Sequence, residues 1–165
     1  MKSKGIIIGI SAILCLAGFF IRDSFLSFSV SKVLNETFTI NDSWSLPHQT
    51  FGTIIFVIAF GIIPLLFLFV KRTRNLTSLP KQLLSITIII ASGIAFWLGR
   101  LFYLKYKAEQ INDLLKRAEF ATADDVPRLK FEEMHFDLYL FLGLLAGALL
   151  TLLFFRRPVQ AGNNG

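Results

Sequence analysis

The chain is poor in the residues that cross-link a fold or hold a cofactor. Its 165 residues include one cysteine, Cys15, and two histidines. A lone cysteine excludes a disulfide framework within the chain, and with it the small extracellular folds that depend on one. The sequence also has no Gly-rich phosphate loop and no Ser/His/Asp combination typical of a hydrolase. These absences favour a function other than catalysis.

Charged residues are scarce as well, and they are nearly absent from four long stretches. Asp, Glu, Lys and Arg make up 17% of the chain and hydrophobic residues 54%, whereas soluble domains average about 25% charged residues. The apolar runs cover residues 5–22, 51–70, 82–104 and 136–155. Each is long enough to cross a hydrocarbon core of about 30 Å as a helix. We therefore expect an all-α membrane protein, a four-helix transmembrane bundle that forms one domain over residues 1–165.

The first apolar run follows Lys2 and Lys4, an arrangement found in both signal peptides and membrane anchors. The run is at the long end for a signal sequence and no Ala-x-Ala cleavage site follows it, so we expect a retained span. Residues 23–50 come next and are rich in Ser, Thr and Asn, with some Phe and Val. We interpret them as an outer connection that contains a short interfacial segment or a strand.

The stretch 105–135, between the third and fourth runs, does not have the composition of a loop. Its first half contains no Gly or Pro, and Ile111, Leu114 and Leu115 have the spacing of an amphipathic helix. After Pro127 a second helix is expected to lead without a break into the fourth span. The sequence therefore predicts a helical hairpin on the outer side of the membrane, and we take its apolar stripe as a candidate partner surface.

Small residues recur at four-residue spacing in three of the runs, so that they fall on one face of a helix. They are Gly5 and Gly9 in the first run, Ala91, Ala95 and Gly99 in the third, and Gly143 and Gly147 in the fourth. In lipid, where apolar burial alone does not drive helices together, such faces allow close backbone approach. We therefore predict that these residues mediate helix packing.

The distribution of charge predicts the orientation in the membrane. The amino terminus, the turn 71–81 and the carboxyl-terminal tail contain Lys and Arg but no acid, whereas all 11 acids fall in or beside the outer connections 23–50 and 105–135. Basic residues concentrate in cytoplasmic segments. We expect both termini in the cytoplasm and residues 158–165 to be disordered. Abundant Ile, Phe, Lys and Asn suggest a bacterial cytoplasmic membrane, and topology, rather than nucleic-acid binding, accounts for the net charge of +6.

Glu132 and His135 form a Glu-x-x-His pattern, which on a helix places a carboxylate and an imidazole on one face. Di-iron bundles use two such motifs with further carboxylates, and this chain has one. His48, at the outer mouth of the second span, and Asp137 are candidates to complete a zinc or copper site. The alternative is a solvated helix face with an interfacial histidine, in which case no metal cofactor is expected.

Arg100 is the one cation inside the third run and lies near its outer end. An arginine at this depth can pair with an acid, such as Asp137 or Glu133 across the hairpin, or contact an anionic substrate. It can also extend to the lipid headgroups at little cost. We keep all three interpretations, with Arg100 and Asp137 as the candidate buried ion pair.

Together these patterns favour a protein that works in the bilayer through contacts with other proteins. It would be an accessory or scaffold subunit of another membrane protein, or a homo-oligomer. No acid, lysine or histidine lies in the middle of a run, which disfavours secondary transport. A second hypothesis is an oligomeric pore lined by Ser85, Thr87 and Ser92. A third is a membrane enzyme or metal-handling protein that uses the outer His and Glu residues.

Overall fold

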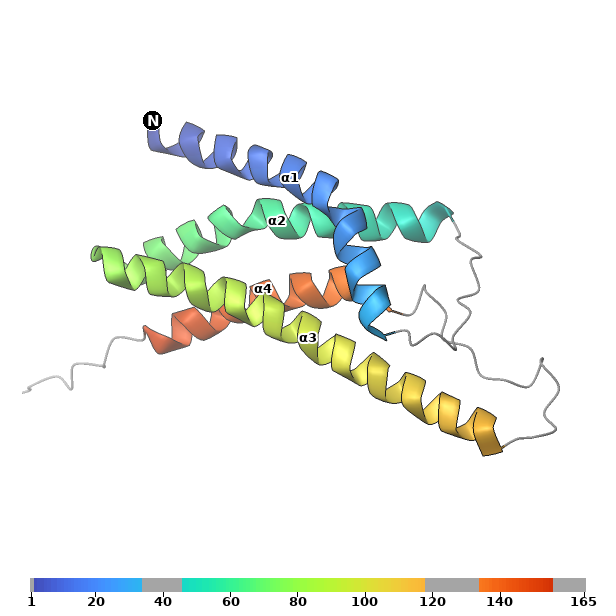
Figure 1. Ribbon diagram of the computed structural model, residues 1–165. Coiled ribbons are helices and arrows are strands. Elements are labelled where there is room, and N and C mark those ends of the chain that lie inside the picture. Colours follow the sequence, from blue (N-terminus) through green and yellow to red (C-terminus); the bar gives the residue numbers. More distant parts are fainter. Residues whose placement is uncertain (1, 34–45, 118–133, 156–165) are drawn as a thin grey trace, which may run out of the picture.

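The apolar runs all fold as α-helices in a computed structural model of the chain, which describes residues 2–33, 46–117 and 134–155 (Figure 1). The helices are α1 (Lys2–Val33), α2 (Leu46–Arg74), α3 (Leu79–Arg117) and α4 (Phe136–Phe154). Each contains an apolar stretch long enough to cross a membrane. A helix bonds its backbone groups internally, as lipid requires. The prediction of an all-α integral membrane protein with four transmembrane helices is confirmed.

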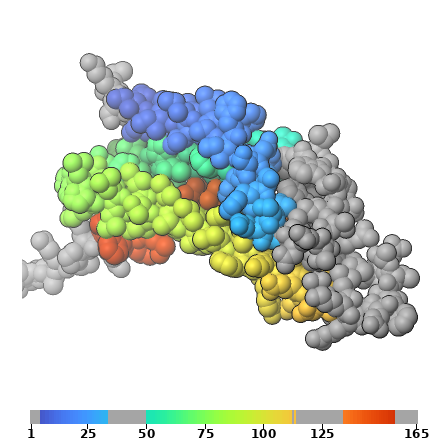
Figure 2. Space-filling model, viewed as in Figure 1, coloured from blue at the N-terminus to red at the C-terminus, as the bar shows by residue number. Residues whose placement is uncertain are grey.

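The helices run up and down in chain order, so that α1 begins and α4 ends at the same end of the bundle (Figure 1). We call the opposite end, where Arg22 and Asp137 lie, the distal end. α4 lies behind α3 in this view and also contacts α2, while α1 packs mainly on α2. In α4, 44% of the most apolar stretch is buried within the chain, whereas in α1 this share is 6%. α4 therefore holds the bundle together, and α1 forms one edge of it, as Figure 2 shows.

α1 is longer than the sequence indicated. It continues past residue 22 to Val33, so the expectation of a strand is wrong for residues 23–33, which are helical. Leu26 and Val33 lie two turns apart on this extension and are buried in one cluster with Leu104 of α3. This hydrophobic contact stabilises a helix that the serine content of the segment does not favour by itself.

α3 continues beyond its apolar run to Arg117, but this extension alone does not show the helical hairpin predicted for residues 105–135. The return half, residues 118–133, lies outside the described part of the chain. α4 does not continue an earlier helix, because His135 has left-handed backbone angles (φ 46°, ψ 36°). The Tyr139 amide donates to the His135 carbonyl at 3.1 Å and so starts the helix. The prediction of an unbroken helix leading into the fourth span is therefore wrong.

α3 and α4 approach each other closely over the two glycines of α4. A Cβ built on Gly143 would lie 2.7 Å from the Ser92 carbonyl oxygen and 2.8 Å from the Cα of Gly93. A Cβ on Gly147 would lie 2.8 Å from the Cα of Ile89. These are backbone atoms, so a larger residue could be accommodated only by moving the helices apart. The four-residue glycine spacing of α4 thus lies in the tightest contact that α4 makes with α3.

The other two small-residue faces point away from the bundle. Apart from chain neighbours and the nearby backbone of the same helix, no described atom lies within 4 Å of a Cβ built on Gly5, Gly9 or Gly99. Ala91 and Ala95, on the same side of α3 as Gly99, are exposed. Within the described part of the chain these residues make no close helix contact, and α3 turns a different face toward α4.

α2 and α3 are joined by a turn that is held by its own hydrogen bonds. Asn75 has φ 50° and ends α2 in the left-handed conformation, and the Leu76 amide donates back to the Lys71 carbonyl at 3.2 Å. This is the Schellman pattern of a helix C-terminus. The side chain of Gln82 donates to the Leu76 carbonyl at 2.9 Å and accepts from Lys71 Nζ at 3.1 Å. The basic turn 71–81 is therefore bonded to both helices that it connects.

We expect Gly143→Ala to lower the free energy of unfolding by about 1–3 kcal/mol, because the added methyl group meets the backbone of α3. The matched control is Gly99→Ala, which adds a methyl group in open space and removes a flexible helical residue, so its effect should be neutral or stabilising. The measurement is helix content during titration with sodium dodecyl sulfate in mixed micelles. Equal effects of the two substitutions would contradict the close approach.

Candidate functional site

A buried carboxylate lies at the distal end of the bundle, where three helices meet. Asp137, in the first turn of α4, is 8% exposed. Its Oδ2 atom packs on Gly52 of α2, where a Cβ would also lie 3.4 Å from Nη2 of Arg22 on α1. Because Gly52 has no side chain, the acid and the cation can both occupy the space beside α2.

The charges of Asp137 and Arg22 attract each other at this point. The side chain of Arg22 is 11% exposed and also contacts the carboxylate of Asp23 at 3.3 Å. Removing charges from water is costly, and an opposite charge at short range offsets part of that cost. The first turn of a helix is in addition a favourable place for a carboxylate, because the helix dipole is positive there. Asp137 thus connects α4 electrostatically to α1.

The sequence suggested Arg100 as a candidate partner of Asp137. In the structure, the arginine whose charge acts on Asp137 is Arg22. Arg100 Nε instead donates to the Met134 carbonyl at 3.0 Å. The sequence did not reveal Arg22 as the partner because α1 was expected to end there. Since α1 continues as a helix, Arg22 becomes an internal position whose side chain faces the bundle.

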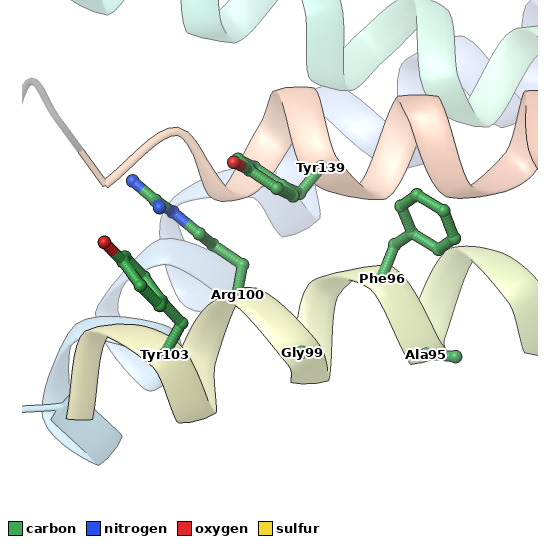
Figure 3. Close-up of a pocket in the computed structure, with 6 residues that line it drawn as sticks. All are labelled: Ala95, Phe96, Gly99, Arg100, Tyr103 and Tyr139. Carbon is green, nitrogen blue, oxygen red and sulfur yellow. The ribbon is translucent and has the colours of Figure 1, made fainter. Parts of the chain in front are cut away.

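A second polar feature, an open groove of about 540 Å³, lies on the outside of α3 near the start of α4 (Figure 3). It is lined by Ala95, Phe96, Gly99, Arg100, Tyr103 and Tyr139. Arg100 lies between the two tyrosines, with its guanidinium carbon 5.3 Å from the ring centre of Tyr103 and 4.8 Å from that of Tyr139. Both contacts are in the range of cation–π attraction.

An indole–hydroxyl contact near these two features links α3 to α1. Trp97 Nε1 donates to Ser29 Oγ at 3.0 Å, and Ser29 Oγ donates in turn to the Phe25 carbonyl at 2.7 Å. The Phe25 ring lies 5.4 Å from that of Trp97 and 4.8 Å from that of Phe56 on α2. Such aromatic contacts add to the burial of the rings. The sequence contained no signal for this set, because its members are far apart along the chain.

The four candidate metal ligands do not form a site in the part of the chain that the structure describes. His135 is exposed and precedes α4, and Asp137 is buried beside the Arg22 cation. Because His135 is not helical, the helical-face argument for its spacing from Glu132 does not hold. Glu132 and the side chain of His48 lie outside the described residues. Among described side chains, no three His, Cys, Asp or Glu residues are arranged to hold a metal ion.

The predicted partner stripe on α3 is partly an internal surface. Ile111 is 6% exposed and belongs to the cluster formed with Leu26 and Leu104. It therefore packs inside the chain and does not contribute an accessible partner surface. Leu114 and Leu115 are part of α3, and their side chains lie outside the described residues.

Of the three residues proposed to line a pore, Ser85 and Ser92 lie on one side of α3 and Thr87 lies on the other. Ser85 is fully buried, and the backbone of Ser92 faces Gly143 of α4. Thr87 is exposed, and its hydroxyl donates to the Leu83 carbonyl at 3.1 Å. Within one chain they do not share a surface, so the arrangement does not favour a pore lined by all three.

Comparison of the chain with protein-family models, with curated protein sequences and with solved structures gives no match in any of the three.

A double-mutant cycle tests the pairing of Arg22 with Asp137. Asp137→Leu leaves a buried cation without this counter-charge, and Arg22→Met leaves a buried carboxylate without it, so each should cost on the order of 2 kcal/mol of unfolding free energy. The double variant should cost less than the sum of the two, by about 1–3 kcal/mol. The measurement is the denaturation titration described above for the glycine variants.

The matched cycle combines Arg100→Met with Asp137→Leu. We expect its two effects to add to within about 0.5 kcal/mol, as for residues that are not partners. A larger coupling energy between Asp137 and Arg100 than between Asp137 and Arg22 would instead support the candidate pair inferred from the sequence.

Proposed function

We propose that the protein acts through contacts that its transmembrane helices make with another membrane protein, or with a second copy of this chain, and not through catalysis. The observation that carries the proposal is the open glycine face of α1. Gly5 and Gly9 are exposed, and no described atom of another helix lies within 4 Å of a Cβ built on either. The apolar part of α1 is 6% buried in the chain. α1 therefore offers a long accessible face to a neighbouring helix.

The glycine face of α1 is separate from the face that α1 uses inside the bundle. Cys15 packs on Gly61 of α2, and a Cβ built on Gly18 would lie 3.1 Å from the Cβ of Phe60. At 3.6 residues per turn, Gly5 and Gly9 lie on average roughly 130° around the helix from these contacts. A second helix could therefore dock on the glycines while α1 remains packed on α2.

The chain itself contains an example of the contact that this spacing supports. In α4, Gly143 and Gly147 have the same four-residue spacing as Gly5 and Gly9, and they lie against the backbone of α3. In a bilayer such close approach is a main source of helix association, because lipid already solvates apolar side chains. The docked occupant is a helix of an accessory partner or α1 of a second copy.

We further propose that the protein lies in a bacterial cytoplasmic membrane with both termini in the cytoplasm. Lys2, Lys4 and the basic turn 71–81 lie at one end of the up-and-down bundle, opposite the distal end. Segments rich in Lys and Arg are retained in the cytoplasm. The groove beside Arg100 would then face the outer leaflet.

Reporter fusions made in bacteria test this orientation. A green fluorescent protein fused after Arg74 should fluoresce, and alkaline phosphatase fused after Arg117 should be active, because the first folds in the cytoplasm and the second outside it. Replacing Lys71, Arg72 and Arg74 by asparagine should weaken the preference, since the basic turn sets it. Fluorescence after Arg117 together with phosphatase activity after Arg74 would reverse the assignment.

Substitution of one glycine on the open face of α1 tests the proposed association. Gly9→Leu should weaken helix association in lipid by about tenfold, or about 1.4 kcal/mol, because the side chain prevents close approach. In proteoliposomes that contain only this chain, energy transfer between differently labelled copies measures self-association. The matched control is Gly99→Leu, which enlarges an equally open position on α3.

A photo-crosslinking residue at Leu16, which is exposed on the same side of α1, identifies the occupant in native membranes. Cross-links between two copies support a homo-oligomer, and cross-links to a different protein support an accessory subunit, provided that Gly9→Leu removes them. Association and cross-links that are unchanged in Gly9→Leu would refute the proposal.

A further inference from the structure

The groove on the outside of α3 lies where the headgroup layer of a bilayer is expected. From Lys81, the charge that precedes the apolar run of α3, to Arg100 is a rise of about 28 Å at 1.5 Å per residue. This nearly equals the thickness of a hydrocarbon core, about 30 Å. Arg100 therefore lies at the opposite boundary when Lys81 lies at one. Tyr103 and Tyr139, beside it, are of a residue type that concentrates at this level.

At the end of the groove near the membrane boundary, the guanidinium of Arg100 is held in a fixed position. The Arg100 side chain is held by the bond from Nε to the Met134 carbonyl, at 3.0 Å, and by the rings of Tyr103 and Tyr139 on either side (Figure 3). Tyr103 is 54% exposed, so the surroundings of the cation are open to the bilayer. A guanidinium fixed in this way loses little conformational freedom when it binds a phosphate.

The part of the groove beside Gly99 and Ala95 is suited to an acyl chain, which has no polar groups. Gly99 and Ala95 lie one and two turns along α3 from Tyr103, and they form a low floor because they carry little or no side chain. No described atom of another helix lies within 4 Å of a Cβ built on Gly99. Phe96 lines the groove beside this floor. The cation and the apolar trough are therefore continuous along the axis of one helix.

We propose that this groove is a binding site for one anionic glycerophospholipid, with the phosphate at Arg100 and an acyl chain along Gly99 and Ala95. Any groove that faces the bilayer is covered by lipid, and the proposal concerns selection by headgroup. The guanidinium attracts a lipid with net negative charge, whereas a zwitterionic lipid brings its own cation next to Arg100. This site is independent of the glycine face of α1, which carries no cation.

Native mass spectrometry of the detergent-solubilised full chain, titrated with phosphatidylglycerol or phosphatidylcholine, tests the proposal. We expect one phosphatidylglycerol to bind about tenfold more tightly than phosphatidylcholine. Arg100→Gln should remove this preference. Lys105→Gln is the matched control, because it neutralises an exposed cation on the same helix that does not line the groove, and it should change the affinity less than about twofold.

A second variant keeps the test valid if Arg100→Gln loosens the fold. Gly99→Leu fills the trough and leaves the bond between Arg100 and Met134 in place, and it should weaken phosphatidylglycerol binding at least about fivefold, since the acyl chain loses its contact surface. Gly9→Leu should leave lipid binding unchanged, so this test and the association test can fail separately. Equal affinity for the two lipids, or unchanged binding by Gly99→Leu, would overturn the proposal.

Discussion

The close approach of α4 to α3 is the contact on which the rest of the structure depends. Apolar burial contributes little to association in lipid, so the helices are held by van der Waals contact between surfaces that fit. Gly143 and Gly147 allow the backbone of α4 to touch that of α3. Because α4 also contacts α2, its position on α3 determines where its first turn enters the bundle, and therefore where Asp137 lies.

That position places a charge in an environment where charges are costly. The arrangement is tolerable because Arg22 approaches from α1 and Gly52 leaves space on α2. The charges of Asp137 and Arg22 can therefore offset each other in this way only when α1 and α4 are both packed against α2. The Trp97 contact with Ser29 joins the same helix α1 to α3. The distal end of the bundle thus depends on polar contacts, while the contact between α3 and α4 depends on close packing.

The four spans could be predicted because a long apolar run is a local pattern that admits few structures in lipid. The four-residue spacing of Gly143 and Gly147 was visible for the same reason. The pairing of Arg22 with Asp137 could not be predicted, since it required knowing that α1 continues to Val33. That extension depends on hydrophobic contacts with α3, which no local pattern records. The left-handed conformation of His135, which separates α4 from what precedes it, likewise has no signal in its neighbours.

Small residues at the same spacing meet three different surroundings in this chain, and the surroundings decide what each face can bind. In α4 the glycines meet the backbone of α3 and are used internally. In α1 they are bare and flanked by exposed isoleucines, so the contact that they favour is with another apolar helix. On α3, Gly99 adjoins a cation held between two aromatic rings. A helix that docked there would meet this cation at the membrane boundary, whereas a phospholipid carries an anion at that depth. The cation, and not the small-residue spacing, is therefore what distinguishes the proposed lipid site from the proposed protein contact.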